Sequence, residues 1–379
     1  MRGIRRARRA VSGIALAAAL ASCTAQSSTG RAPGGAAEAG AAAAGRGAFT
    51  VVATGDVIPY PSVIEQAAAD AGGEGHDFRR IFAGVKPVVA PADLAICHME
   101  TPYGPPGGPF TGYPMFASPP QVAAGLRATG YDSCSTASNH TLDGGFDGLR
   151  RTLDALDRAG IRHTGSARTA AEARRPARLR AGGAEVAHLA YTYGTNGVPL
   201  PDGRNWAVSL LEPDRVTADA RAARRAGADV VLVSLHWGTE WQQEPDGDQL
   251  SLARRLTASE TGGRKDIDLL IGTHNHVPQA YEKVNGTWVV YGLGDQVASF
   301  VPEKYRGNEG SMARFTFAPE PDGERWRVEK AEFLAGHSDT GPPFRVVRAT
   351  AQNFPEVRDR VRKAVLSRGA EQDGLTEGR

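Results

Sequence analysis

The stretch Asp268-Leu-Leu-Ile-Gly-Thr-His274-Asn-His276 joins an apolar run of strand length to two histidines that are two residues apart. On an extended segment alternate side chains point to the same side, so these two imidazoles can address adjacent metal ions, or one ion and a substrate oxygen. A polar turn after a buried strand is the structural alternative. We favour the metal-binding interpretation, because the rest of the sequence repeats the pattern.

Five more short apolar runs end in polar residues, at 49–56, 93–100, 131–140, 229–236 and 288–295. Runs rich in Val, Ile and Leu are typical of strands covered on both faces. Helical spacing between them predicts one helix from Asp143, as a possible N-cap, to Gly160, and another from Pro213 to Gly227. In layered α/β folds ligands bind beyond the carboxyl ends of strands. We therefore expect the polar residues at the ends of the six runs, called the polar tips below, to converge at one rim of a sheet.

The polar tips carry Asp, Glu, Asn and His side chains, which suit a pair of Zn, Mn or Fe ions rather than a thiolate site. Each residue alone has an ordinary alternative. Asn139 and His140 could form a turn before the helix, and His236 could be a buried core histidine, although Glu240 follows it closely. His76, His163, His188 and His337 lie outside the set and need no role beyond packing or the surface.

Several segments, in order along the chain, give a family resemblance. They are Thr54-Gly55-Asp56, Met99-Glu100-Thr101-Pro102, Asn139-His140, His236-Trp237-Gly238-Thr239-Glu240, Gly272 with His274 and His276, and Tyr291-Gly292-Leu293-Gly294-Asp295. The chain resembles the CapA (poly-gamma-glutamate capsule biosynthesis) family of the calcineurin-like metallophosphoesterase superfamily, roughly over residues 50–300. The resemblance implies an α/β fold, specifically a four-layer α/β/β/α sandwich.

The resemblance also implies roles for the site residues. Glu100 would bridge two divalent metal ions, with Asp56 and His276 at one ion. The other ion would be held by Asn139, His236 and His274. The expected catalytic residues are His140, as acid or transition-state stabiliser, and Glu240, as an acid/base candidate.

One departure from the superfamily pattern concerns the first metal. Typical calcineurin-like enzymes carry Asp-x-His in the first motif, whereas Asp56 is followed by Val57 and Ile58, which leaves that ion a ligand short. His98 and Glu100 project from the same face of an extended segment. We therefore take His98 as a possible extra ligand, and expect one or two ions in the site.

The N-terminus has the form of an export signal. A basic start and an apolar run over 11–21 lead to Leu20-Ala21-Ser22-Cys23, which resembles a lipoprotein cleavage site with Cys23 lipidated; an ordinary secretory signal is the alternative. We divide the chain into a signal peptide (1–22), a flexible Ala/Gly-rich tether (23–47), one domain (48–368) and a disordered tail (369–379). Removing 1–22 takes away five arginines, so 39 Lys+Arg remain against 42 Asp+Glu, and nucleic-acid binding is not expected.

These features predict an extracytoplasmic lipoprotein of the cell membrane that acts in the synthesis or anchoring of capsule or another extracellular polymer. The expected partners are an extracellular anionic polymer or a phosphorylated small molecule, the membrane through the lipid, and capsule-assembly proteins. We expect a metal-dependent hydrolase; a non-catalytic scaffold, or a metal-free hydrolase using Asp56 and Glu100, are the alternatives. Cys97 and Cys134 sit in strand-like runs, and we expect two separately buried thiols there.

Overall fold

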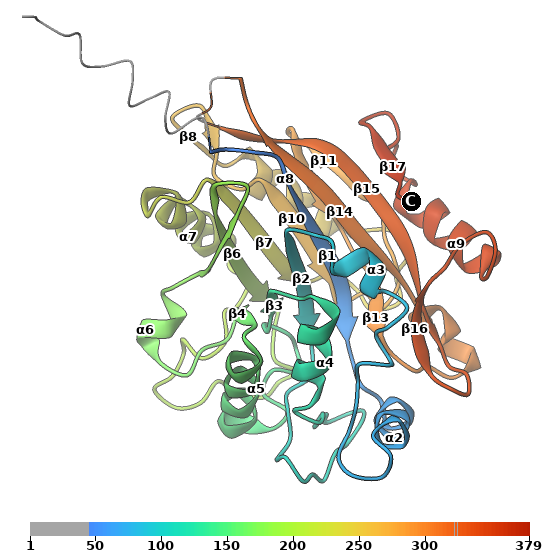
Figure 1. Ribbon diagram of the computed structural model, residues 1–379. Helices are drawn as coiled ribbons and strands as arrows, with labels where there is room; N and C mark the ends of the chain where they lie inside the picture. Colours follow the sequence, from blue (N-terminus) through green and yellow to red (C-terminus); the bar gives the residue numbers. More distant parts are fainter. Residues whose placement is uncertain (1–44, 322, 324) are drawn as a thin grey trace, which may run out of the picture. The chain divides into compact units, whose positions relative to one another are not determined.

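The computed structural model describes residues 45–321, 323 and 325–379. The expected signal peptide and Cys23 lie outside the described residues, as does nearly all of the expected tether. Two β-sheets form the centre of the described part (Figure 1). Within the described residues, no helix has the length and apolar character needed to cross a bilayer.

The larger sheet has nine strands in the order β16-β15-β14-β1-β2-β3-β4, with β13 also pairing with β1 and β17 with β15. Strands β1 to β4 and β13 run parallel, whereas β14, β15 and β16 add antiparallel neighbours. Its strands are β1 (Phe49–Val57), β2 (Leu94–Met99), β3 (Ser133–Ser135), β4 (Arg162–Thr164), β13 (Asp295–Val297), β14 (Glu309–Pro319), β15 (Trp326–Asp339), β16 (Arg345–Arg348) and β17 (Leu375–Glu377).

The smaller sheet has six strands in the order β11-β12-β10-β7-β6-β5, of which β6, β7, β10 and β12 are parallel. A short ribbon of β8 (Glu260–Thr261) and β9 (Arg264–Lys265) lies outside both sheets. The six strands are β5 (Ala177–Ala181), β6 (Ala184–Thr192), β7 (Val230–His236), β10 (Leu269–Thr273), β11 (Tyr281–Val284) and β12 (Thr287–Val290).

The helices cover the outer faces of the two sheets. Those against the larger sheet are α2 (Pro61–Asp70), α3 (Lys86–Val89), α4 (Val122–Thr129) and α5 (Gly145–Ala159), and those against the smaller sheet are α7 (Pro213–Arg225) and α8 (Gly247–Ala258). The remaining ones are α6 (Ala170–Ala173), the 3-10 helix η1 (Pro302–Asn308) and α9 (Pro355–Val365).

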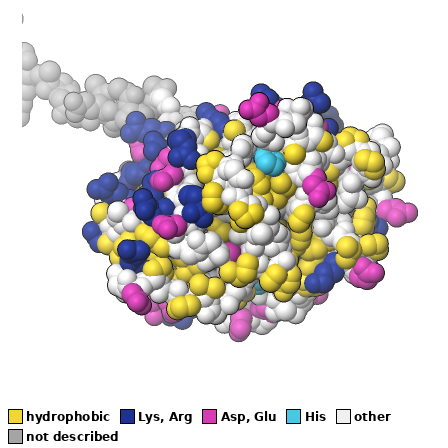
Figure 2. All heavy atoms as spheres, turned by 90° about the horizontal axis from the view of Figure 1, so that it is seen from below, with side chains coloured by type: hydrophobic (Ala, Val, Ile, Leu, Met, Phe, Trp, Pro, Cys, Tyr) yellow, Lys and Arg dark blue, Asp and Glu magenta, His cyan; other side chains and the backbone are white. Residues whose placement is uncertain are grey.

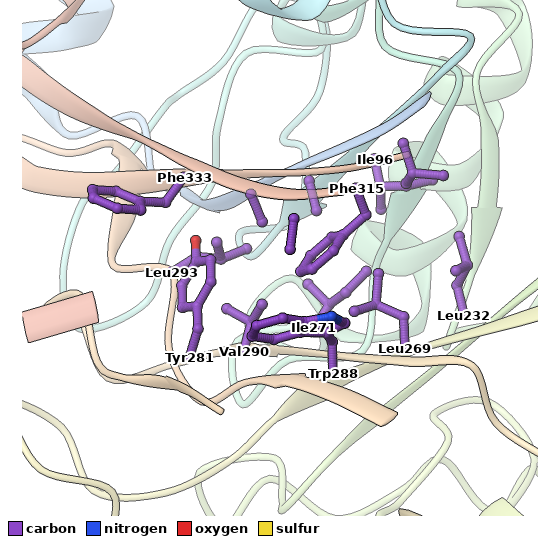
Figure 3. Packing of buried hydrophobic residues seen from close by; sticks show 14 of the residues in the cluster. Ile96, Leu232, Leu269, Ile271, Tyr281, Trp288, Val290, Leu293, Phe315 and Phe333 are labelled. Atoms are coloured by element: carbon purple, nitrogen blue, oxygen red, sulfur yellow. The ribbon is translucent and has the colours of Figure 1, made fainter. Parts of the chain in front are cut away.

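Alternation along the central strands builds three hydrophobic layers. In β2, Leu94 and Ile96 face the smaller sheet, while Ala95, Cys97 and Met99 face the helices. Alternate apolar side chains of β7 and β10 likewise point into the space between the sheets, where they interdigitate with apolar side chains of the larger sheet (Figure 3). The predicted four-layer α/β/β/α sandwich is therefore confirmed.

The two helix predictions hold with one correction. Helix α7 occupies the expected segment, and Gly160 ends α5 in a left-handed conformation with φ of 74°. Asp143, however, is not the N-cap of α5, because its carboxylate accepts hydrogen bonds from the Phe116 backbone N–H and pairs with His140 instead.

Two expectations about the ends and the cysteines are wrong. The tail 369–379 is not disordered, since β17 pairs with β15, Leu375 is buried, and Glu377 forms a salt bridge with Arg358. Cys97 and Cys134 form a disulfide rather than two thiols. They occupy the same register position on the adjacent strands β2 and β3, with their Cα atoms 4.4 Å apart, which is a bonding distance.

The apolar run 288–295 is not one strand. Its first part is β12 of the smaller sheet, and after Val290 the chain crosses to the larger sheet, where Asp295 begins β13. The six polar tips therefore lie at the ends of two facing sheets, not at one rim of a single sheet.

Candidate metal centre

A row of polar residues crosses the larger sheet where the apolar layer between the sheets ends. Asp56 on β1 is paired in register with Asp295 on β13 at one side and with His98 on β2 at the other, and His98 is in turn paired with Ser135 on β3. A register irregularity between Ala53 and Asp56 accompanies this change from apolar to polar side chains. The strand pairing alone thus places two carboxylates and an imidazole side by side.

The smaller sheet supplies a matching row. Inward positions of β7 continue from Val230 and Leu232 to His236, which is paired with Thr273 on β10. The rings of His236 and His98 stack across the two sheets with centroids 4.7 Å apart. Each of the two rings is oriented by a hydroxyl group, since Nδ1 of His98 lies 2.6 Å from Ser135 Oγ and Nδ1 of His236 lies 3.1 Å from Thr273 Oγ1. The Nε2 atoms are thereby the nitrogens that face the centre.

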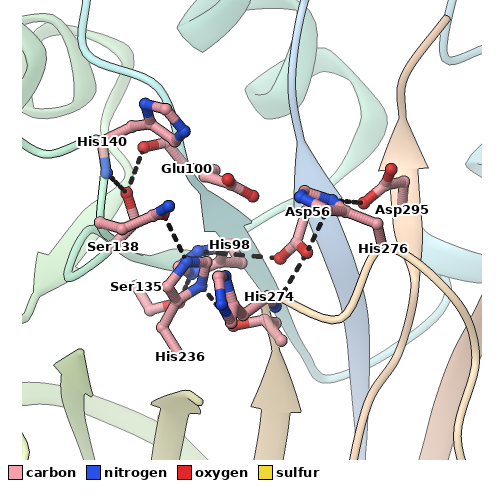
Figure 4. A network of polar contacts seen from close by, with 12 residues as sticks. Asp56, His98, Glu100, Ser135, Ser138, His140, His236, His274, His276 and Asp295 are labelled. Carbon is pink, nitrogen blue, oxygen red and sulfur yellow. Dashed lines mark hydrogen bonds and ion pairs between the residues drawn. The ribbon is translucent and has the colours of Figure 1, made fainter. Parts of the chain in front are cut away.

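The loop after β10 folds back toward Asp56. His274 and His276 both have positive φ, 94° and 57°, which bulky residues adopt mostly where surrounding contacts hold them. The His274 backbone N–H donates to Asp56 Oδ2 at 3.0 Å. His276 Nδ1 lies 3.0 Å from Asp295 Oδ1 and 4.0 Å from Asp56 Oδ2 (Figure 4).

The loops after β2 and β3 complete the site. The Ser138 hydroxyl donates to the Glu100 carbonyl oxygen at 2.6 Å and accepts from the His140 backbone N–H, which ties the two loops together. Asn139 Oδ1 lies 2.8 Å from His236 Nε2. His140 stands beside this pair, and its Nδ1 lies 2.7 Å from Asp143 Oδ2.

The donor atoms fit divalent ions. Ligand atoms of Asp56, His98, Glu100 and His236 lie within 4.8 Å of one another, and so do those of Asp56, His276 and Asp295. Asp56 belongs to both groups. Several of these buried atoms have no hydrogen-bond partner among the described residues: Asp56 Oδ1, His98 Nε2, both carboxylate oxygens of Glu100, His274 Nδ1 and Asp295 Oδ2. Unpaired buried carboxylates and imidazoles are costly unless a cation binds between them.

The pKa shifts of the protein without bound ions also favour a cation site. Burial, together with the neighbouring carboxylates, raises the pKa of Asp56 and of Glu100 well above the usual range, and burial does the same for Asp295. Burial lowers the pKa of His98 and of His274 to about 3. The imidazoles are therefore neutral, which is the form that binds metal, and the carboxylates lack a counter-charge.

Aromatic side chains surround the histidines on the solvent side. Tyr193 lies against His274, with ring centroids 4.6 Å apart, and Phe116 meets His140 edge-on. Trp241 and Phe300 contact His276. These rings narrow the opening, so the ligands are almost inaccessible to solvent: His276, at 7% exposure, is the most accessible of the predicted ligands.

The model of the family described as bacterial capsule synthesis protein PGA_cap matches residues 50–299. The chain belongs to this family. All the predicted metal ligands of this PGA_cap protein fall inside the matched segment, from Asp56 to His276.

Relatives of the PGA_cap protein include a Mycobacterium tuberculosis protein named "Probable polyglutamine synthesis accessory protein", 30% identical over 196 residues, which are 48% of this chain and 49% of that protein. The "PGA biosynthesis protein CapA" of Bacillus subtilis is 27% identical over 179 residues, 45% of this chain and 44% of that protein. The chain thus matches about half the length of these relatives. The crystal structure of the calcineurin-like phosphoesterase YfkN from Bacillus subtilis has a TM-score of 0.46 and 16% identity, covering 84% of this chain and 97% of that one. At this score the likeness is too distant to bear on activity.

The six ligands predicted for the PGA_cap protein come together, but not in the predicted grouping. Asp56, and not Glu100, is shared by the two groups of acidic and histidine ligands, and His274 lies beside them without being a member. Asn139 Oδ1 lies 2.8 Å from His236 Nε2, next to the first group. His98 is a member of one group, in line with its prediction as an extra ligand. Glu240 is exposed at the edge of the site.

Asp295 is the member that the sequence reasoning did not assign. The residue stood at the end of an apolar run and within a family-like segment, so a signal existed. The run 288–295 is not one strand, however, and its sequence does not show where the chain leaves the smaller sheet. Only the crossing to the larger sheet brings Asp295 next to Asp56. Tyr193 was also missed, since β6, which precedes it, was not among the six runs.

Proposed function

We propose that this chain is a metal-dependent hydrolase that acts outside the cytoplasm in the making, release or anchoring of a capsule-type polymer. Membership of the capsule synthesis family and the printed names of its relatives support the cellular role. The Cys97–Cys134 disulfide supports the location, because structural disulfides form and persist in oxidising compartments. A lipid on Cys23 would hold the protein at the membrane, where its polymer and capsule-assembly partners would be.

One observation carries the catalytic part of the proposal: six buried residues from two sheets converge in two groups that share Asp56. We assign Asp56, His98, Glu100 and His236 to one divalent ion and Asp56, His276 and Asp295 to the other. Mn, Zn or Fe suit this mixture of imidazoles and carboxylates. When bound, two such ions would act as Lewis acids on a phosphoryl or carbonyl oxygen and supply a bound water with a pKa near ~7.

His140 is positioned to move a proton. Asp143 occupies its Nδ1, which leaves Nε2 for exchange with a leaving group, as a carboxylate-oriented histidine does in other hydrolases. Phe116 meets the ring edge-on and further restricts its orientation. Glu240, exposed at the edge, is the candidate for a second acid/base, because it can approach a substrate without being itself a ligand.

A surface scaffold without turnover is the second candidate. The segment Asp56-Val57-Ile58 lacks the histidine of the usual first motif, and the aromatic rings leave little access to the centre. On this view the cleft would bind polymer or a partner protein, and the buried ligands would hold an ion for stability alone.

Metal content and turnover separate the two candidates. The full chain, loaded with Mn or Zn and desalted, is analysed for bound metal and assayed on a generic aryl phosphate. The hydrolase predicts bound metal and turnover that both fall in His236→Ala and His274→Ala variants. His76→Ala serves as the control, because His76 lies outside the site and should change neither quantity.

Metal without turnover on phosphate esters or on amide-linked polyglutamate would favour the scaffold. Absence of metal from the loaded protein would reject the metal-dependent hydrolase, because the unpartnered buried ligand atoms would then hold no ion.

A further inference from the structure

A second, cationic site lies away from the metal centre, at the edges of the two sheets. There a groove of about 610 Å³ runs between β4, α6 and the start of β5. Lys and Arg side chains gather on the same side of the molecule, the side on which α6 and α7 lie (Figures 1 and 2). The groove is lined by Asp157, Arg162, His163, Arg168, Glu172 and Arg175, among others, and by Arg178, which pairs with Glu185.

The arginines of this groove differ in their partners. Arg168 is neutralised by Asp154, Asp157 and Glu172. The side chains of Arg162 and Arg175 are exposed and form no ion pair or hydrogen bond with any residue that the structure describes. The same is true of Arg174, which lines a pocket of about 140 Å³ continuous with the groove through Arg175.

The local sequence concentrates this charge. Between 158 and 180 the chain has seven arginines and one acidic residue, Glu172. Arg162 and Arg175 line the groove, and Arg174 and Arg175 line the adjoining pocket. A concave cationic wall focuses attraction on an anion. Arginine in particular fits carboxylates, because its planar guanidinium can donate two parallel hydrogen bonds.

We propose that this groove binds an extended polycarboxylate chain. It runs beside two strands that each pair on one side only, β4 with β3 and β5 with β6, so an elongated ligand has an open path along them. The nature of the polymer rests on the proposed function, whereas the binding itself requires no metal. A nucleic acid fits less well, because no Phe, Tyr or Trp is among the described residues that line the groove, and two carboxylates lie in its wall.

A chain of contacts links the adjoining pocket to the metal centre. The 140 Å³ pocket is lined by Thr164, which is paired in register with Ser135. The Ser135 hydroxyl in turn contacts His98. Only β3 lies between β4, at the groove, and β2, which carries His98. A polymer held in the groove would therefore have a raised local concentration at the metal centre.

Binding of a labelled oligoglutamate to the full chain tests the proposal. Fluorescence anisotropy is measured in low-salt buffer with a chelator present, so that no ion contributes. The variant Arg162→Gln/Arg174→Gln/Arg175→Gln should bind about tenfold or more weakly than the wild type, as expected for three lost charge contacts. Its affinity should also depend less steeply on salt.

The matched control removes the same charge elsewhere. Arg80, Lys86 and Arg254 are exposed and form no ion pair within the described residues, so Arg80→Gln/Lys86→Gln/Arg254→Gln should change the affinity by less than about twofold. Equal weakening in both triple variants would overturn the proposal, because net charge alone would then explain binding. Unchanged thermal unfolding of both variants shows that the fold is kept.

Two further outcomes are decisive. If single-stranded DNA binds as tightly as oligoglutamate and depends on the same arginines, the groove is not a polycarboxylate site. The variant His236→Ala should bind oligoglutamate as tightly as the wild type, because the groove needs no metal. If the protein binds oligoglutamate through these arginines but shows neither bound metal nor turnover, the groove proposal is supported and only the hydrolase proposal is rejected.

Discussion

Replacing Asp295 by Asn should have opposite effects on the metal-free and the metal-bound protein. In the chelated protein the change removes one of two facing buried carboxylates and should raise stability. In the loaded protein it removes an anionic ligand and should weaken the ion held by Asp56 and His276. The melting temperature of the chelated protein should therefore rise and that of the metal-loaded protein should fall, so the difference between them becomes smaller.

The size of each effect follows from the geometry. Carboxylate atoms of Asp56 and Asp295 lie within 4.8 Å of one another, so two full charges repel by about 3 kcal/mol at an effective dielectric constant of about 20. The raised pKa of both groups means that a proton already relieves part of this repulsion. A gain of about 1–2 kcal/mol remains, or about 2–4 °C for a chain of this size. Each tenfold loss in metal affinity removes about 1.4 kcal/mol of metal-dependent stability.

Thermal unfolding of the full chain, with chelator and with excess Mn or Zn, measures both effects without an activity assay. Asp268→Asn is the control, because Asp268 is a largely buried carboxylate directly before β10 that is paired with Arg224 and accepts a hydrogen bond from the Val231 backbone N–H. This variant should melt lower in both states by a similar amount. If Asp295→Asn behaves in the same way as Asp268→Asn, Asp295 is a structural residue and the assignment of the second ion is wrong.

Three further predictions concern stability. The chelated protein should be most stable near pH 6–7. As the pH falls below that range, the unfolded chain binds protons at histidines that stay neutral in the folded state, with pKa about 3 for His98 and His274, so stability is lost. As the pH rises above it, carboxyls that are ionised in the unfolded chain stay protonated in the folded state, because burial raises their pKa, so stability is lost again; denaturant midpoints from pH 4 to 9 test this, and a rise toward pH 9 would contradict it. Replacing Cys97 and Cys134 by Ala should lower the free energy of unfolding by about 3–4 kcal/mol, because the bridge closes a loop between residues that are 37 positions apart. Urea unfolding measures this loss, and a loss below about 1 kcal/mol would contradict the presence of the bridge in the isolated protein. Gly55→Ala should lower the melting temperature and the metal content, because an added Cβ would lie 1.7 Å from the Gly294 carbonyl oxygen, and an unchanged melting temperature would refute that contact.

The sequence was sufficient for the fold class and for most of the centre. Continuous apolar runs that end in Asp, Glu or His predict buried parallel strands with polar carboxyl ends, and the register of β1, β2 and β7 then places Asp56, His98 and His236 together. The side on which His98 points could also be predicted, because it continues the period of two from Leu94 and Ile96.

Contacts that depend on which strands are neighbours could not be predicted from single runs. The Cys97–Cys134 bridge requires that β2 and β3 be adjacent and in that register, which neither run contains. Asp295 required the crossing from β12 to β13. The arginines of 158–180 were overlooked as a patch for a similar reason, because only the folding of β4, α6 and β5 around one groove brings the unpaired ones together.

The division of the ligands between two sheets has a consequence for how the protein matures. Asp56, His98 and Glu100 come from the first third of the chain, whereas His236, His274, His276 and Asp295 come from the second half, and the two sets meet only when the sheets dock. Ion uptake must therefore be a late event, after both halves have been made and closed on each other. Any ions that the finished protein holds would be those available in the compartment where that closure takes place, so its metal content would report where it folded.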